Sequence, residues 1–456
     1  MRSIPRLAIT LGLALLAAPA LAQQEVPPIE LETFTLDNGL KVIVHEDHST
    51  PIVAVNIWYD VGSTNEEPGR SGFAHLFEHM LFQETTNLEP GEFKKYILEA
   101  GGTYNGTTNE DRTAYFETVP SNRLNLALWL EAERMENLTV TPENFDRERE
   151  VVKEERRLRI DNQPYGEAFL TLDTLAADWP PYNHTVIGSM DDLSAATAED
   201  VLAFYEQYYV PNNAALVISG DVTLEEAREM VGEYFGDIAR GPDLAALPEV
   251  TPTPRTDGER RKVLEDDLAN TPIYFAAFNI PPHDHPDSYP LQLLSSIFSE
   301  GESSRLNQRL VRDEKAALTV ISQLDSRVGP GVFFFGGIPN QDVEVDRIEA
   351  LINEEIDKLK NEGVNARELQ KAKNQLRANQ IEGRQTVFSK SMSLQHYRLY
   401  HGDASEINQD LDRYMAVTLD DIRRVARTYL VPANRTVVIA VPEGEKSEKK
   451  VETSEG

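Results

Sequence analysis

The chain has 456 residues, of which 40% are hydrophobic, and it carries a formal net charge of −32. This length and hydrophobic content suffice for two or three packed domains and exclude a globally disordered chain. So negative a charge repels phosphate backbones, which excludes nucleic acid as an expected partner. The chain contains no cysteine, so disulfide bonds do not contribute to its stability.

The first segment has the pattern of a secretory signal peptide. Arg2 and Arg6 precede an apolar run, Leu7 to Ala18, that is too short to span a bilayer, and Ala20-Leu21-Ala22 matches a small-residue cleavage site. We predict that residues 1–22 are removed during export, with a bacterial periplasm as the destination and no stable membrane anchor. The alternative interpretation of this segment is a retained membrane anchor.

Residues 23–240 are predicted to form a first domain of mixed strands and helices. The turn Asp37-Asn38-Gly39 lies between two β-rich runs and predicts a hairpin, and Ile52 to Val61 predicts another strand. Helical periodicity then extends from Phe73 to Gln83.

This helical segment contains three polar side chains in an apolar setting. His75 and His79 are four residues apart and share one face, with Glu78 beside them. Two imidazoles one turn apart can bind one metal ion, and a neighbouring carboxylate can act on metal-bound water. In the alternative interpretation they are ordinary helix residues, but such a cluster inside a core would be costly without a metal.

A third metal ligand is expected from a later segment, "PENFDREREVVKEERRLRID". Catalytic zinc takes three protein ligands and keeps one open position. Glu148 and Glu155 are seven residues apart and fall within the apolar stripe of the helix, which we assign to Phe145, Val151, Val152 and Leu158. We predict Glu155 as the ligand and Glu148 as a supporting group; the alternative is a charged surface helix.

The other histidines carry weaker signals. His283 and His285 stand among prolines, which favours a solvated loop over a second metal site. His184 is predicted at the surface rather than in a pocket, and His396 and His401 have no ligand spacing.

The second half of the chain repeats the plan of the first. Residues 241–261 are rich in proline and charge and predict a linker, residues 262–442 a second mixed domain, and residues 443–456 a disordered tail. "TAEDVLAFYEQYYVPNNAALVISGDV" in the first domain matches "TLDDIRRVARTYLVPANRTVVIAV" in the second at one constant offset, beginning with Thr197 and Thr418. We interpret this match as an internal duplication in which one copy carries the active centre.

"HLFEH" and "EREVVKEE" resemble the zinc-binding segments of the pitrilysin and mitochondrial processing peptidase family, the inverzincins. The resemblance implies that His75, His79 and Glu155 bind one Zn²⁺ per chain, that Glu78 is the general base and that Glu148 supports the site. It also implies an α+β fold of two homologous α/β-sandwich halves that form a clamshell.

The same resemblance extends to substrate binding. "GGTYNGTTNEDRTAYFE" is similar to the edge strand with which the family binds an extended peptide, and Asn105 is the matching side chain. Many relatives hold the substrate carbonyl with an arginine and a tyrosine of the second half. Arg305 and Arg312 are present here, but Thr319 stands at the place of the tyrosine. We therefore predict a heterodimer with a homologous chain that lacks the zinc motif, or a homodimer.

The resulting functional prediction is a zinc-dependent endopeptidase that hydrolyses unfolded peptides or small unstructured protein segments. The alternative is a non-catalytic peptide-binding or structural subunit of a processing-peptidase-like complex. Intact Glu78 disfavours that alternative because a scaffold does not need a base beside its metal. A metal-storage protein is disfavoured because it would show a His-rich or Cys-rich tract.

Overall fold

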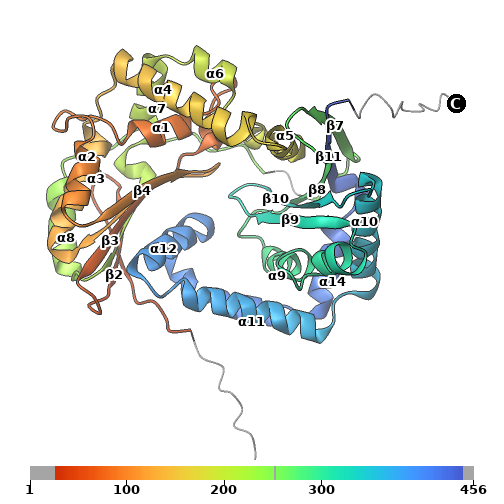
Figure 1. Ribbon diagram of the computed structural model, residues 1–456. Helices are drawn as coiled ribbons and strands as arrows, with labels where there is room; N and C mark the ends of the chain where they lie inside the picture. The colour runs from red at the N-terminus through yellow and green to blue at the C-terminus, as the bar shows by residue number, and fades with distance from the viewer. Residues whose placement is uncertain (1–25, 251–252, 445–456) are drawn as a thin grey trace, which may run out of the picture.

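The computed structural model describes residues 26–250 and 253–444, so the predicted signal peptide and most of the predicted tail lie outside the described residues. The fold is α+β with two mixed sheets, which stand on opposite sides of the molecule (Figure 1). The first sheet has the order β1-β2-β6-β3-β5-β4 and the second β7-β11-β8-β10-β9. The strands are β1 (Glu32–Thr35), β2 (Lys41–Glu46), β3 (Ile52–Tyr59), β4 (Thr103–Thr108), β5 (Thr113–Pro120), β6 (Ala214–Gly220), β7 (Arg260–Asp266), β8 (Ile273–Ile280), β9 (Ala317–Asp325), β10 (Gly331–Pro339) and β11 (Arg435–Pro442).

Helices follow the strands in both halves. Those before the linker are α1 (Phe73–Met80), α2 (Glu92–Glu99), α3 (Leu124–Glu136), α4 (Pro142–Arg156), α5 (Gly166–Ala176), α6 (Met190–Ala195), α7 (Ala198–Tyr208) and α8 (Leu224–Phe235). Those after it are α9 (Ser288–Phe298), α10 (Val345–Glu362), α11 (Ala366–Glu382), α12 (Val387–His401), α13 (Asp410–Ala416) and α14 (Leu419–Tyr429). Among the described helices, none is long and apolar enough to cross a membrane.

The two sheets have equivalent topology. Apart from β1, each strand of the first sheet has a counterpart at the same place in the second, with one parallel pair, β2–β6 or β7–β11, and antiparallel pairs elsewhere. Thr197 and Thr418 cap α7 and α14 in the same way. The side chains of Asn213 and Asn434 donate equivalent bonds of 2.9 and 2.8 Å to a tyrosine carbonyl. These repeated contacts agree with the predicted duplication.

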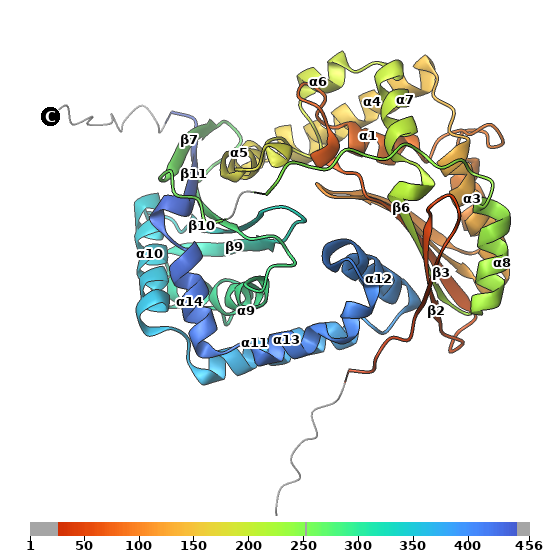
Figure 2. The same cartoon turned by 180° about the vertical axis from the view of Figure 1, so that it is seen from behind.

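The two halves exchange one helix each. Helix α5 precedes the linker but packs on the second sheet, where Ala168 and Leu172 contact the core around Phe275. Helix α12 follows the linker but packs on the first sheet, where the Gln395 amide donates to the main-chain oxygen of Asn56 at 2.9 Å. Both views show the exchange (Figures 1 and 2). The predicted domain boundary therefore falls between the two sheets, but each sheet packs against one helix from the other side of that boundary.

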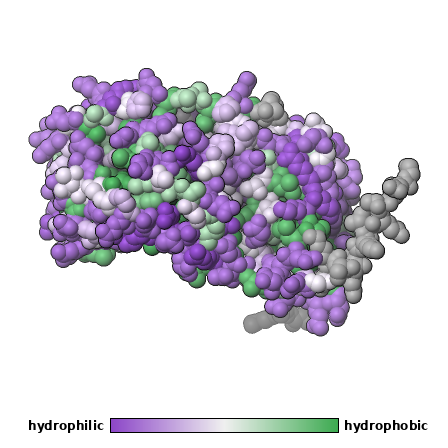
Figure 3. Space-filling view, turned by 90° about the horizontal axis from the view of Figure 1, so that it is seen from above, coloured by the Kyte–Doolittle hydropathy of each residue, from purple (hydrophilic) through white to green (hydrophobic). Residues whose placement is uncertain are grey.

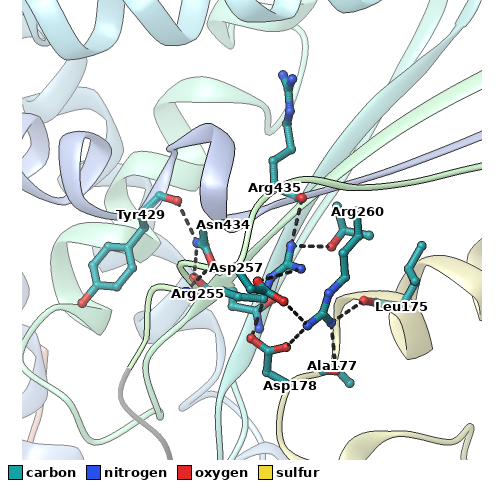
Figure 4. Close-up of polar contacts among 11 residues, drawn as sticks. Leu175, Ala177, Asp178, Arg255, Asp257, Arg260, Tyr429, Asn434 and Arg435 are labelled. Atoms are coloured by element: carbon teal, nitrogen blue, oxygen red, sulfur yellow. Dashed lines mark hydrogen bonds and ion pairs between the residues drawn. The ribbon is translucent and has the colours of Figure 1, made fainter. Parts of the chain in front are cut away.

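The end of α5 is tied to the second sheet by an arginine. The Arg260 guanidinium on β7 donates to the Leu175 carbonyl at 3.0 Å and pairs with Asp178 at 2.5 Å (Figure 4). Next to it, the main-chain nitrogen of Arg255 donates to the Asn434 side chain at 2.9 Å. β7 therefore begins at Arg260, inside the segment predicted as linker, because it pairs with β11 and holds α5.

The zinc-motif helix is part of the first core. Phe73, Leu76, Phe77 and Met80 of α1 are all buried there. Because these apolar residues of α1 are buried, the helix is fixed in place, and the polar side chains between them point in a set direction.

Hydrophilic side chains cover most of the face of the molecule seen from above, with hydrophobic ones in scattered groups (Figure 3).

Candidate metal centre

The start of α1 is held by a buried carboxylate. Glu66 accepts hydrogen bonds from the main-chain nitrogens of Gly72 at 2.9 Å and Ala74 at 2.8 Å. Gly72 has a φ of 95°, and a Cβ on it would lie 2.8 Å from the Ile187 carbonyl oxygen, so a side chain does not fit at this turn. His184 Nε2 lies 2.9 Å from Glu66 Oε2. The predicted surface role of His184 is therefore wrong, because this histidine is a partner of the helix cap.

Three predicted ligands converge between α1 and α4. Oε2 of Glu155 lies 3.2 Å from Nε2 of His79 and 3.7 Å from Nε2 of His75. The three ligand atoms all lie within 4.8 Å of one another. Glu155 reaches this place from a helix distant in sequence because α4 packs directly against α1.

The buried face of α4 differs in part from the predicted one. Phe145, Glu148 and Val152 are buried, and Glu155 continues this face one turn further. Val151 and Leu158, which we assigned to the apolar stripe, are exposed. Leu158 lies beyond the end of α4 in a wider π-helical turn, Arg157–Asp161, which shifts its side chain off the face.

Glu78 stands beside the ligands and faces an edge strand. Its Oε2 accepts a hydrogen bond of 2.7 Å from the Thr108 hydroxyl on β4. Burial raises the pKa of the Glu78 carboxyl above its usual value, and the Thr108 hydrogen bond opposes that shift. Gly106 on the same strand allows this approach, because a Cβ there would lie 3.1 Å from Cγ of Glu78. Thr108 and Gly106 were not predicted from the sequence, because their spacing carries no motif.

Glu148 lies on the far side of His79. Its Oε2 is 3.9 Å from Nδ1 of His79, and its Oε1 is 3.3 Å from Nε of Arg147. The hydrogen bond that His79 gives Glu155 lowers the pKa of the Glu155 carboxyl, despite partial burial. Arg159 also pairs with Glu155 at 2.7 Å.

The ligands line a pocket of about 760 Å³. Asn105 lines it from β4, together with its strand neighbours Tyr104, Gly106, Thr107 and Thr108. Neither Arg305 nor Arg312 is among the described residues that line this pocket. Arg305 is paired with Glu368 at 2.8 Å, and Arg312 is paired with Glu302 at 2.6 Å, both within the second half.

These donor groups fit a zinc ion. Burial and the neighbouring His79 lower the pKa of His75 to about 4, which keeps the ring neutral and able to donate a lone pair. Nδ1 of His75 is buried without a hydrogen-bond partner in the described part of the chain. Two imidazoles, one carboxylate and an open pocket are the ligand set of catalytic zinc in hydrolases. The site is therefore that of a metal-dependent hydrolase.

Sequence comparison agrees with this class. The family described as "Insulinase (Peptidase family M16)" matches residues 41–176, and "Peptidase M16 inactive domain" matches residues 195–376. The zinc protease PqqE of Helicobacter pylori is 32% identical over 433 residues, which cover 94% of this chain and 96% of that protein. A probable mitochondrial-processing peptidase subunit beta of Arabidopsis thaliana is 23% identical over 410 residues, 88% of this chain and 76% of that one. The chain belongs to peptidase family M16 and is a zinc protease.

Solved structures show the same fold. A protease from Helicobacter pylori, 31% identical, superposes with a TM-score of 0.85 over 91% of this chain and 100% of that chain. The periplasmic protease PqqL from Escherichia coli, 19% identical, gives a TM-score of 0.72 over 91% of this chain and 48% of that chain. The PqqL likeness shows the fold alone, since its identity is low.

Proposed function

We propose that this protein is an endopeptidase that cleaves unfolded peptides or unstructured protein segments, with Zn²⁺ held by His75, His79 and Glu155. The observation that carries the proposal is the position of Glu78. Its carboxyl lies between the ligand cluster and β4, and Thr108 holds it there at 2.7 Å. A base in that place can take a proton from a water molecule while it lies beside the peptide bond to be cleaved.

The side chains divide the chemistry among them. When bound, Zn²⁺ supplies a Lewis acid that polarises the scissile carbonyl and lowers the pKa of a water molecule to about 7. Glu78 takes a proton from the attacking water and delivers it to the leaving amine nitrogen. Its raised pKa suits the first role, since a more basic carboxylate takes up a proton more readily. Glu148 orients His79 through Nδ1.

Substrate binding is assigned to β4. This strand is the last of the first sheet, so one of its edges is free to pair with an extended peptide. Asn105 and Thr107 of β4 line the same pocket as the zinc ligands. Replacement of Asn105 by alanine is expected to raise KM more than it lowers kcat, because this side chain contacts the peptide rather than the reacting atoms.

The two halves are proposed to enclose the substrate as a clamshell. Support comes from the placement of the second sheet opposite the first, with α11 and α12 between them (Figure 2). An enclosed space admits flexible chains and rejects folded ones. A quenched unstructured peptide should therefore be cleaved, and the same sequence within a stable folded domain should not. Equal cleavage of both would contradict the enclosure.

Metal dependence separates the enzyme from a non-catalytic peptide-binding subunit. Removal of metal by a chelator should abolish cleavage of the unstructured peptide, and Zn²⁺ should restore it, whereas Mg²⁺ should not, because imidazole ligands do not select it. Peptide binding without cleavage by the zinc-loaded protein would favour the binding subunit instead.

We further propose a dimer in which a homologous chain completes the carbonyl-binding pair. Thr319 occupies the expected tyrosine position on β9 and is exposed, and Arg312 is engaged by Glu302. Mixing with the homologous chain should raise kcat by a large factor. Ordinary turnover by a lone homodimer would contradict the heterodimer.

Export is also part of the proposal. It rests on the pattern of residues 1–22. Fractionation of cells that express the full chain should place a shortened protein in the periplasm. A protein of unshortened mass in the cytoplasm would contradict export.

A further inference from the structure

A second histidine cluster lies outside the site described above. His283 follows β8, and His396 and His401 lie on α12. One nitrogen of each ring lies within 4.8 Å of the other two. The rings of His283 and His396 have centroids 4.9 Å apart, and those of His283 and His401 are 4.8 Å apart. The expectation of a solvated loop is therefore wrong for His283, because the exchange of α12 brings this loop against two further histidines.

We propose that His283, His396 and His401 form a second metal site, which takes a divalent transition-metal ion of the Zn²⁺ class and links α12 to the β8–α9 loop. Three imidazoles are a known zinc ligand set with an open fourth position. Imidazole also selects against Mg²⁺ and Ca²⁺, which prefer oxygen ligands.

The nitrogen positions are close to those that one ion requires. Nε2 of His283 and Nε2 of His401 are 3.1 Å apart. Two nitrogens that bind one zinc ion tetrahedrally, each at about 2.1 Å, lie about 3.4 Å apart. Only a small adjustment of the two rings is needed to admit the metal.

The cluster is held by its surroundings. The main-chain nitrogen of His283 donates to the Arg327 carbonyl at 2.9 Å, and its carbonyl accepts from the Ser288 hydroxyl at 2.6 Å. Helix α12 is fixed to the first sheet by Arg398, whose guanidinium binds Asp60 at 2.5 and 2.6 Å. Both sources of ligands are thus anchored to different halves of the molecule.

One buried carboxylate oxygen beside the cluster lacks a partner. Oδ1 of Asp410 is buried and has no hydrogen-bond partner in the described part of the chain. Asp410 and His396 line one pocket of about 610 Å³, which gives an ion a path of entry. The Asp410 carboxyl interacts electrostatically with His401, and burial raises its pKa above the usual value.

Burial also keeps the rings in the state that binds metal. It lowers the pKa of His283 to about 4 and that of His396 to about 3, so both rings are neutral at neutral pH. Two cations face the cluster: Arg112 contributes to the lowered pKa of His396, and Arg413 contributes to that of His401. The metal would bind without first displacing a proton from either ring.

The test uses a chain whose first site is disabled. The double variant His75→Ala/His79→Ala should still bind one Zn²⁺ or Co²⁺, with the visible absorption of imidazole-bound Co²⁺. Addition of His283→Ala should remove that ion. His48→Ala is the matched control, since His48 is exposed and lies away from the cluster, and it should leave binding unchanged.

Zinc content of the otherwise intact protein is the second measurement, because it leaves the first site and its contribution to folding in place. The intact protein should hold two ions per chain, and His283→Ala or His401→Gln should hold one, with the remaining ion showing that the fold survives. One ion in the intact protein that neither substitution removes would overturn the proposal. Metal content is measured without peptidase activity, so the proposed second metal site can be refuted or supported separately from the proposed function.

Discussion

At the scale of single residues, the site combines groups that the sequence marks with groups that it does not. His75, Glu78 and His79 stand in one short motif, and the placement of all three on α1 beside the pocket follows from helical spacing. Glu66 and Thr108 bond to this helix and to Glu78, yet they come from a turn and a strand with no recognisable spacing. Such partners depend on tertiary packing, which no local pattern encodes.

Replacement of Glu148 by alanine is expected to weaken zinc binding at the first site by about 10- to 100-fold, because His79 loses the carboxylate beside Nδ1. The measurement is zinc affinity by competition with a chelator. It is made in chains that also carry His283→Ala, so that only the first site binds zinc. Glu150→Ala is the control, since Glu150 lies on the exposed side of the same helix. Equal affinity in both variants would show that Glu148 does not support His79.

Gly106→Ala is expected to lower kcat by roughly tenfold, because the new methyl group crowds Phe82 at 3.0 Å and Cγ of Glu78 at 3.1 Å and shifts the Glu78 carboxyl relative to Thr108. Zinc content should not change. Gly232→Ala on α8 serves as control, since a Cβ there meets no atom within 4 Å. Unchanged kcat in the Gly106 variant would mean that the position of Glu78 tolerates this displacement.

At the scale of elements, the exchange of α5 and α12 is the feature that the sequence did not reveal. Hairpin β1–β2, strand β3 and helix α1 follow from local turn chemistry and periodicity, and each is present near its expected bounds. The partner sheet of α12 cannot be predicted in this way, because helical periodicity marks an apolar face but does not indicate which sheet covers it. Specific contacts, such as the hydrogen bond from Gln395 to Asn56, determine which sheet α12 packs against.

Arg398→Ala should lower the free energy of unfolding by about 1–3 kcal/mol, because it removes the charged hydrogen bonds to Asp60 at the junction of α12 and the first sheet. Arg157→Ala is the control: its pair with Glu154 at 3.0 Å is exposed on both sides and should cost about 0.5 kcal/mol or less. Denaturant unfolding measures both. Similar losses would show that α12 is not anchored through Arg398.

Acid should weaken the same junction. The hydrogen bond from Lys390 on α12 is the main reason that the pKa of Asp47 lies far below its usual 3.8. A carboxyl with a lowered folded-state pKa contributes stability that is fully present above about pH 4 and is lost as the pH falls toward the folded-state value. Asp47→Asn should therefore be less stable than the parent at neutral pH, and the difference should shrink below about pH 4. A difference that does not change with pH would contradict this role.

At the scale of the whole molecule, the duplication explains both the fold and the single active centre. The repeat around Thr197 and Thr418 is visible in the sequence, and the matching strand orders of the two sheets agree with it. In the second half, α9 has no histidine or glutamate, so this sheet supports the enzyme without a metal motif of its own. The histidine cluster between α12 and the β8–α9 loop could not be predicted, because its members come together through the helix exchange.

The central claim is that Glu78 acts as the base of a zinc peptidase. The most direct measurement compares zinc content and cleavage of an unstructured peptide in the parent and in Glu78→Gln. Zinc content should be unchanged and kcat should fall by about 10²- to 10⁴-fold, because the amide keeps the shape of the side chain but cannot take a proton. Wild-type turnover in the zinc-loaded variant would contradict the central claim.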